Sequence, residues 1–105
     1  MKAVFAAAAL GLSIACSAAT AAGDTAAGRA KSEACLGCHG IPSYNNTYPT
    51  YRVPKLSGQQ AEYLVAALKA YRDGQRRHPT MNVQATSMSE QDMADIAAFW
   101  QAQGK

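Results

Sequence analysis

Hydrophobic residues fall at helical spacing in two stretches of the chain. The first stretch carries its apolar side chains on one face, formed by Ala61, Leu64, Leu68 and Tyr71. Ser57, with Gln60 three residues later, predicts a capping box before this stretch, and Gly74 supplies a stop. The pattern therefore predicts a helix that begins after Ser57 and ends before Gly74.

A second apolar stripe lies near the end of the chain. Its members are Met93, Ile96, Ala97 and Trp100. Ser89 with Asp92 three residues later is a capping-box pair, and Gly104 follows the stripe. These signals predict a final helix that begins just after Ser89 and ends before Gly104.

The rest of the chain gives weaker signals. Asp24 to about Cys35 is predicted as a short helix, in which Gly28 costs about 1 kcal/mol against Ala unless it allows another helix to approach closely. Residues 40–55 and 75–87 show neither helical nor alternating periodicity and are predicted as loops. With no strand pattern, the fold class is all-α, with three to four short helices and long connections.

The beginning of the chain has the pattern of a secretory signal peptide. Lys2 precedes an apolar run from Ala3 to Ala15, and small residues follow it up to a cleavage site near Ala21 or Ala22. A membrane anchor is the alternative, but the run is shorter than the roughly 20 residues of a spanning helix. We therefore expect a signal peptide over residues 1–22 and export to the periplasm.

Residues 23–105 then form one small domain. A domain of this size is near the lower limit at which a hydrophobic core alone can stabilise the fold, so a covalent cross-link or a bound cofactor is expected. Lipidation of Cys16 is a minority alternative for localisation, because Ser13 stands where a lipoprotein box normally has Leu. The formal net charge of +3 is too small to indicate nucleic-acid binding.

The chemistry is concentrated in residues 35–39, which read Cys-Leu-Gly-Cys-His. In a C-x-x-C-H motif two thiols add to the vinyl groups of a haem as thioethers, and the adjacent histidine reaches the iron. Cys35 and Cys38 are the only cysteines after the signal, so any covalent link that stabilises the domain has to come from this pair. The sequence predicts one covalently attached haem c, ligated by His39.

Three other readings of the cysteines compete. A thioredoxin-like redox pair would need a βαβ setting, which is not visible. A zinc site could use Cys35, Cys38, His39 and His78, but His39 directly after Cys38 breaks the usual ligand spacing. A plain disulfide would leave His39 and the long loops unexplained.

Several stretches together carry a family resemblance. They are Cys35 to Gly40, Pro54-Lys55-Leu56-Ser57-Gly58-Gln59, Arg72-x-Gly74-x-Arg76 and Ser89-Glu90-Gln91-Asp92. They stand in the order found in class I cytochromes c, and the chain most closely resembles the bacterial c4 and c553 monohaem type. The tyrosine-rich insert 41–53 departs from the glycine-rich loop of many relatives.

The resemblance implies a small class I cytochrome c fold, with short helices and long loops wrapped around one haem. It also implies a second iron ligand, a methionine from the segment before the last helix, and Met81 is so placed. His78 is a chemical rival, and Met88 is a weaker one. Met93 lies on the apolar stripe and is more simply a core residue.

Other site residues follow from the same resemblance. The Pro54 carbonyl would accept a hydrogen bond from the ring of His39, and Leu56 would touch the haem. Arg76 is the best-placed cation for a haem propionate, although a solvated arginine is an equal alternative. The first and last helices would cross at Gly28, facing Phe99 or Trp100.

Iron held between histidine and thioether has no open position, which favours electron transfer over catalysis. We therefore expect a one-electron carrier and no enzyme. Its redox-protein partners would be a quinol-oxidising complex or dehydrogenase upstream and a terminal oxidase or reductase downstream. The alternative is a haem enzyme, or a gas or peroxide sensor, with a labile sixth ligand.

Overall fold

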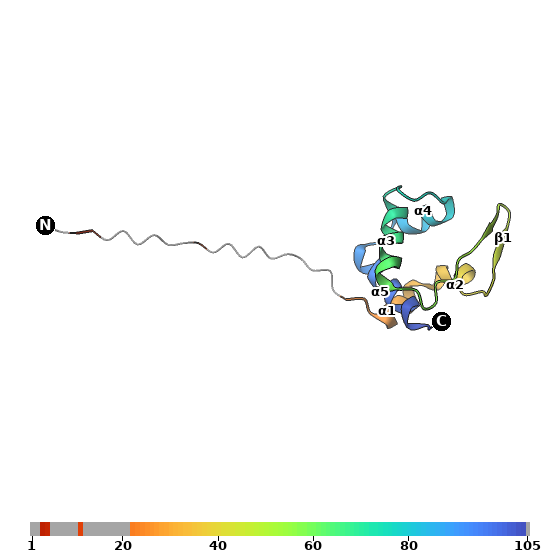
Figure 1. Cartoon of the computed structure of the whole chain (residues 1–105), viewed down its shortest axis with the longest axis horizontal. Coiled ribbons are helices and arrows are strands. Elements are labelled where there is room, and N and C mark those ends of the chain that lie inside the picture. Colours follow the sequence, from red (N-terminus) through yellow and green to blue (C-terminus); the bar gives the residue numbers. More distant parts are fainter. Residues whose placement is uncertain (1–2, 5–10, 12–21, 105) are drawn as a thin grey trace.

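The computed structural model describes residues 3–4, 11 and 22–104 of the chain. Five helices and a two-stranded antiparallel hairpin follow one another (Figure 1): α1 Thr25–Lys31, α2 Glu33–His39, β1 Asn45–Thr47, β2 Thr50–Arg52, α3 Ala61–Arg72, α4 Pro79–Thr86 and α5 Glu90–Ala102. The mostly helical class is confirmed, with five helices instead of three to four. In the described part, no helix has both the length and the apolar character needed to cross a bilayer. The predicted signal segment 1–22 and Cys16 fall almost wholly outside the described residues.

The last helix begins and packs as its sequence predicts. The Ser89 hydroxyl accepts from the Asp92 backbone N–H at 3.0 Å, and the Asp92 carboxylate accepts from the Ser89 N–H at 2.9 Å. Together these bonds satisfy two of the amide groups that a helix start leaves free. The capping box of α5 is therefore confirmed.

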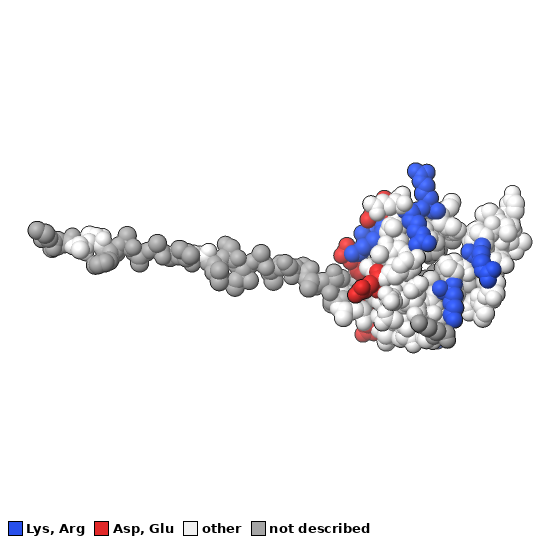
Figure 2. Space-filling view, in the orientation of Figure 1, with Lys and Arg blue, Asp and Glu red and all other residues white. Residues whose placement is uncertain are grey.

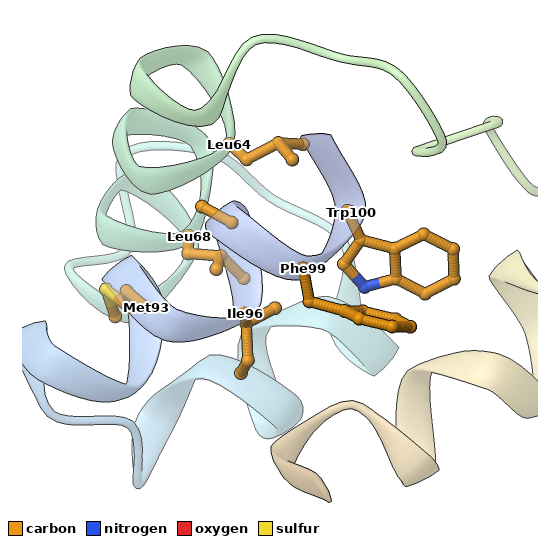
Figure 3. Close-up of a cluster of buried hydrophobic side chains, with 7 residues drawn as sticks. Leu64, Leu68, Met93, Ile96, Phe99 and Trp100 are labelled. Carbon is orange, nitrogen blue, oxygen red and sulfur yellow. The ribbon is translucent and has the colours of Figure 1, made fainter. Parts of the chain in front are cut away.

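The core is built between α3 and α5 (Figure 3). Leu64 and Leu68 reach from α3 onto the buried stripe of α5, which contains Met93, Ile96, Ala97, Phe99 and Trp100. The Phe99 and Trp100 rings meet edge to face, with centroids 5.3 Å apart. Each fully buried leucine contributes about 2 kcal/mol to stability. The apolar faces predicted for α3 and α5 are thus the faces that pack.

The crossing of α1 and α5 depends on Gly28, which is buried. A Cβ built on Gly28 would overlap the backbone carbonyl of Asp95 and lie 2.9 Å from the Cβ of Phe99. Only glycine allows two helices to approach this closely. The predicted close approach is confirmed, and Phe99 rather than Trp100 is the aromatic side chain nearest to Gly28.

The predicted single helix from Asp24 to Cys35 is wrong in one respect, because it is broken at Ser32. The Asp24 carboxylate caps α1 by accepting from the Ala27 N–H at 3.0 Å. Ser32 leaves the helical conformation, at φ −92° and ψ 4°, and its carbonyl accepts from the Cys35 N–H at 2.9 Å. A new helix, α2, therefore starts at Glu33 and carries the whole Cys-Leu-Gly-Cys-His motif.

The segment predicted as a loop over residues 40–55 contains the hairpin. Its register pairs Asn45 with Arg52 and Thr47 with Thr50. The strands have only three residues each and are mostly polar. Such short strands give no alternating pattern for sequence analysis to detect.

The second predicted loop, over residues 75–87, contains α4. This helix has Pro79 in its first turn, which favours a helix start. Its N-cap is His78, a residue type that does not signal a helix start in a sequence. Val83 in its middle is 72% exposed, so α4 has no apolar stripe that the sequence could reveal.

The start of α3 also differs from the prediction. The N-cap is Gln60 and no capping box forms with Ser57, because the Ala61 N–H donates to the side chain of Gln101 at 2.6 Å. The stop is as predicted. α3 ends at Arg72, and Gly74 follows with a left-handed φ of 77°.

A buried carboxylate joins the start of α1 to α5. Asp95 accepts from the Asp24 backbone N–H at 2.9 Å, from the Lys31 ammonium at 2.6 Å and from the Gln91 amide at 2.9 Å. Lys31 also pairs with Asp92 at 2.9 Å. The amide of Asp24, followed by Lys31 and Gln91, holds the pKa of Asp95 at about 2, below its ordinary 3.8.

This network predicts a pH effect on stability. Ionised Asp95 stabilises the fold fully above about pH 4, and this contribution is lost as the pH falls from 3.8 toward 2. Asp95→Asn should lower the denaturant midpoint of the protein at pH 6 and flatten its decline below pH 4. Glu62→Gln, at an exposed carboxylate of α3, is the control and should follow the wild type. Parallel wild-type and Asp95→Asn curves between pH 4 and pH 2 would contradict the assignment.

Candidate functional site

A cavity of about 450 Å³ opens between α2, the hairpin and the three later helices. Its lining contains every residue that the sequence singles out for the site: Cys35, Cys38, His39, Pro54, Leu56, Arg76 and Met81. The rivals His78 and Met88 line it too. Leu64, Leu68 and Ile96 form its wall toward the core. The cavity is thus largely apolar, with potential iron ligands on separate elements.

The two cysteines lie one helical turn apart on α2. Both are free thiols and half-buried, and burial raises the pKa of the Cys35 thiol. Because positions i and i+3 share a helix face, both thiols are presented to the same cavity. This arrangement fits attachment of one planar group along one edge.

His39 ends α2 with its ring orientation fixed. Its Nδ1 lies 2.7 Å from the Pro54 carbonyl oxygen. Since a carbonyl can only accept, Nδ1 carries the proton and the lone pair remains on Nε2. Burial lowers the pKa of His39, against the opposing effect of this hydrogen bond, and so favours the neutral imidazole that a metal requires.

Met81 enters the cavity from the first turn of α4. It is half-buried and packs against the core cluster. His78, the N-cap of the same helix, uses its Nδ1 to accept the Met81 backbone N–H at 3.5 Å. The Asn82 side chain braces this turn by accepting from the His78 N–H at 2.9 Å and donating to the Tyr71 carbonyl at 2.8 Å.

The three methionines of the domain differ in environment. Met81 and Met88 line the cavity, whereas Met93 is fully buried between α3 and α5, as expected of a core residue. His78 also lines the cavity, but one of its nitrogens is already engaged as the helix cap. Met81 and Met88 are therefore the two candidate thioether ligands, and His78 is the weaker candidate because one of its ring nitrogens already accepts a hydrogen bond.

Arg76 is held at the rim by two aromatic side chains. Its guanidinium lies 4.9 Å from the centroid of the Tyr71 ring and donates to the Tyr63 hydroxyl at 3.4 Å. The Tyr63 hydrogen bond, with smaller contributions from Tyr71, raises the pKa of Arg76. A cation fixed beside an apolar cavity is suited to a carboxylate substituent of its occupant.

Several residues of the site have no recognisable signal in the sequence. Tyr51, Tyr63, Tyr71, Thr80 and Trp100 all line the cavity. In the sequence, Tyr51 belongs to an aromatic-rich insert and Tyr71 to a helix face. The fold brings the hairpin, α3 and α4 together, and only then do the tyrosine rings and hydroxyl groups gather at one rim of the cavity.

The donor set fits a haem better than a zinc ion. Zinc needs four converging ligands, and in the described part of the chain no three His, Cys, Asp or Glu side chains are grouped to hold a metal. A haem needs two thiols, one or two axial donors and a broad apolar surround. The lining of the cavity has each of these.

Comparison with known proteins gives the family. The cytochrome c family model matches residues 25–103. Cytochrome c-554(548) of Halomonas halodenitrificans is 45% identical over 85 residues, which cover 78% of this chain and 99% of that protein. Cytochrome c4 of Pseudomonas aeruginosa is 44% identical over 83 residues, which cover 79% of this chain and 40% of that protein.

The fold agrees with these relatives. The structure of reduced recombinant cytochrome c4 from Pseudomonas stutzeri superposes with a TM-score of 0.64 at 34% identity, over 80% of this chain and 48% of that one. The chain thus spans nearly all of cytochrome c-554(548) but less than half of cytochrome c4. It belongs to the cytochrome c family, as a class I c-type cytochrome of the c4 type, an electron carrier whose cofactor is covalently attached haem c.

Proposed function

We propose that this chain is a periplasmic one-electron carrier with one haem, attached through Cys35 and Cys38 and ligated by His39 and Met81. The single observation that carries the proposal is that these four side chains line one apolar cavity. The haem supplies the one-electron chemistry when bound. The protein holds it, supplies both axial donors and limits access to it.

Each residue has a distinct role in this proposal. The Pro54 carbonyl orients His39 and strengthens its donor nitrogen, and Leu56 adds apolar surface. The Met81 thioether would be the second iron ligand, and a soft donor of this kind would favour the reduced state and raise the reduction potential. Arg76 would compensate a propionate charge at the rim. With His39 and Met81 both bound to the iron, no position would be open to a substrate, so the proposed role is electron transfer and not catalysis.

The leader over residues 1–22 supports the periplasmic location, with the mature domain over residues 23–105. Partners are proposed by chemistry: a quinol-oxidising complex or dehydrogenase donates the electron, and a terminal oxidase or reductase accepts it. A small interface, below about 1,200 Å², allows such partners to separate quickly.

Charge supports a docking face at the cavity rim. Arg52, Lys55 and Arg76 line the cavity, and Arg77 is an exposed neighbour. On the face shown in Figure 2, blue basic side chains are spread over the upper and right-hand parts of the body, and one lies beside the red acidic side chains at the left. The red acidic side chains lie toward the left, where the chain enters α1. An acidic partner would therefore be guided to the rim.

Attachment of the haem is tested by intact mass. Protein secreted through its leader should exceed its polypeptide mass by one haem and should have no titratable thiol, because both cysteines are used. The same chain produced without export or haem should have the bare mass and two thiols. A secreted protein with the bare mass would disprove the haem reading.

The sixth ligand is tested by two methionine substitutions. Met81→Ala should abolish the far-red sulfur-to-iron charge-transfer band of the oxidised protein and lower its reduction potential, since a soft donor is lost. Met88→Ala is the matched control, because Met88 also lines the cavity, and it should retain the band. If the two results are exchanged, Met88 is the ligand.

The docking face is tested by a salt series. Stopped-flow oxidation by a terminal oxidase should slow about tenfold or more as salt screens the steering charges. Arg52→Gln should weaken this dependence, whereas Arg29→Gln, at an exposed residue of α1 outside the cavity lining, should not. A rate that is flat or rises with salt would refute basic-face docking, and fast peroxide turnover would refute the carrier role.

A further inference from the structure

The hairpin contacts the helix that carries Met81 through one side chain. Tyr51 of β2 is half-buried, and its ring meets the His78 ring edge to face, with centroids 4.5 Å apart at 86°. Its hydroxyl lies 3.2 Å from Thr80 Oγ1. Tyr51 therefore has two different contacts with the first turn of α4.

Both contacted residues are next to Met81. Thr80 precedes it in the chain, and His78 accepts the Met81 backbone N–H. An aromatic edge contact and a hydrogen bond each contribute about 1 kcal/mol. Displacing this turn from the hairpin would therefore break contacts that flank the Met81 side chain.

The segment that contains Tyr51 also contacts His39, the other candidate iron ligand. Pro54, three residues after Tyr51, accepts the hydrogen bond from His39. The base of the hairpin is closed by the Val53 N–H donating to the Tyr44 carbonyl at 3.0 Å. Residues 51–54 thus contact the surroundings of His39 at one end and of Met81 at the other.

We propose that Tyr51 is a positioning residue that keeps Met81 on the iron by fastening the first turn of α4 to the hairpin. The inference rests on the proposed ligation by Met81. Two states are in equilibrium, one with the thioether bound and one with the turn displaced and the sixth position open. Tyr51 contacts stabilise only the first state, so they lower the population that can bind an external ligand.

Carbon monoxide measures that open population. It binds ferrous haem iron only when the sixth position is free, so its binding rate to the reduced, haem-loaded protein follows the open fraction. Tyr51→Phe removes the hydroxyl bond and keeps the ring, and should speed binding about fivefold. Tyr51→Ala removes both contacts and should speed it about thirtyfold.

Two further variants make the test specific. Thr80→Val should match Tyr51→Phe, and the double variant should show no added effect, because both remove the same bond. Tyr48→Ala is the matched control: this tyrosine of the same hairpin is 95% exposed, and its loss should leave the rate unchanged. The potential and the far-red band of each variant report the thioether independently of folding.

The outcomes separate this inference from the proposed function. If Met81→Ala abolishes the far-red band but Tyr51→Phe and Tyr51→Ala bind carbon monoxide at the wild-type rate, the positioning role is refuted and Met81 ligation stands. If Met81→Ala keeps the band, the ligand assignment fails, and the positioning role fails with it. Faster binding by Tyr48→Ala to the same extent as by Tyr51→Ala would assign the effect to the hairpin as a whole and refute the specific role of Tyr51.

Discussion

The contact between Gly28 and the backbone of α5 is the constraint on which the rest of the structure depends. Only a residue without a side chain lets the two helices meet there, and the crossing brings the Asp95 carboxylate within reach of Asp24 and Lys31. Since α2 starts directly after Ser32, the crossing also determines where the cysteine motif lies relative to α5. The position of the site therefore depends on a contact between helices that lies outside the cavity lining.

The main cluster of buried side chains formed in this way comes from α3 and α5, and its edge is also the wall of the cavity. Cys35, Leu56, Met81 and Met88 pack partly against that core and border the cavity. A domain of this size has little core of its own. Covalently attached haem c, the cofactor of the family, would bury these half-exposed side chains. The cofactor would thereby add buried apolar surface that the polypeptide core lacks.

Features that depend on neighbouring residues in the chain could be predicted from the sequence. The capping box and stripe of α5, the buried face of α3 and the need for a small residue at Gly28 all depend on patterns a few residues long. The start of α3 could not be predicted, because Gln101 of α5 supplies the acceptor from 40 residues away. α4 was missed because its first turn is braced by Asn82 bonding to Tyr71 of α3, and not by an apolar stripe.

The tyrosines show why the candidate site was predicted only in part. The ligand types and the haem follow from one contiguous motif and from family resemblance, but the rim is assembled from distant segments. Tyr63 and Tyr71 present a hydroxyl and a ring face to Arg76, and Tyr51 contacts the turn that carries Met81. An aromatic ring with one polar end suits a boundary between an apolar cavity and water. The rim is therefore the part of the cavity that is built from tyrosines of distant segments, and a motif a few residues long could not reveal it.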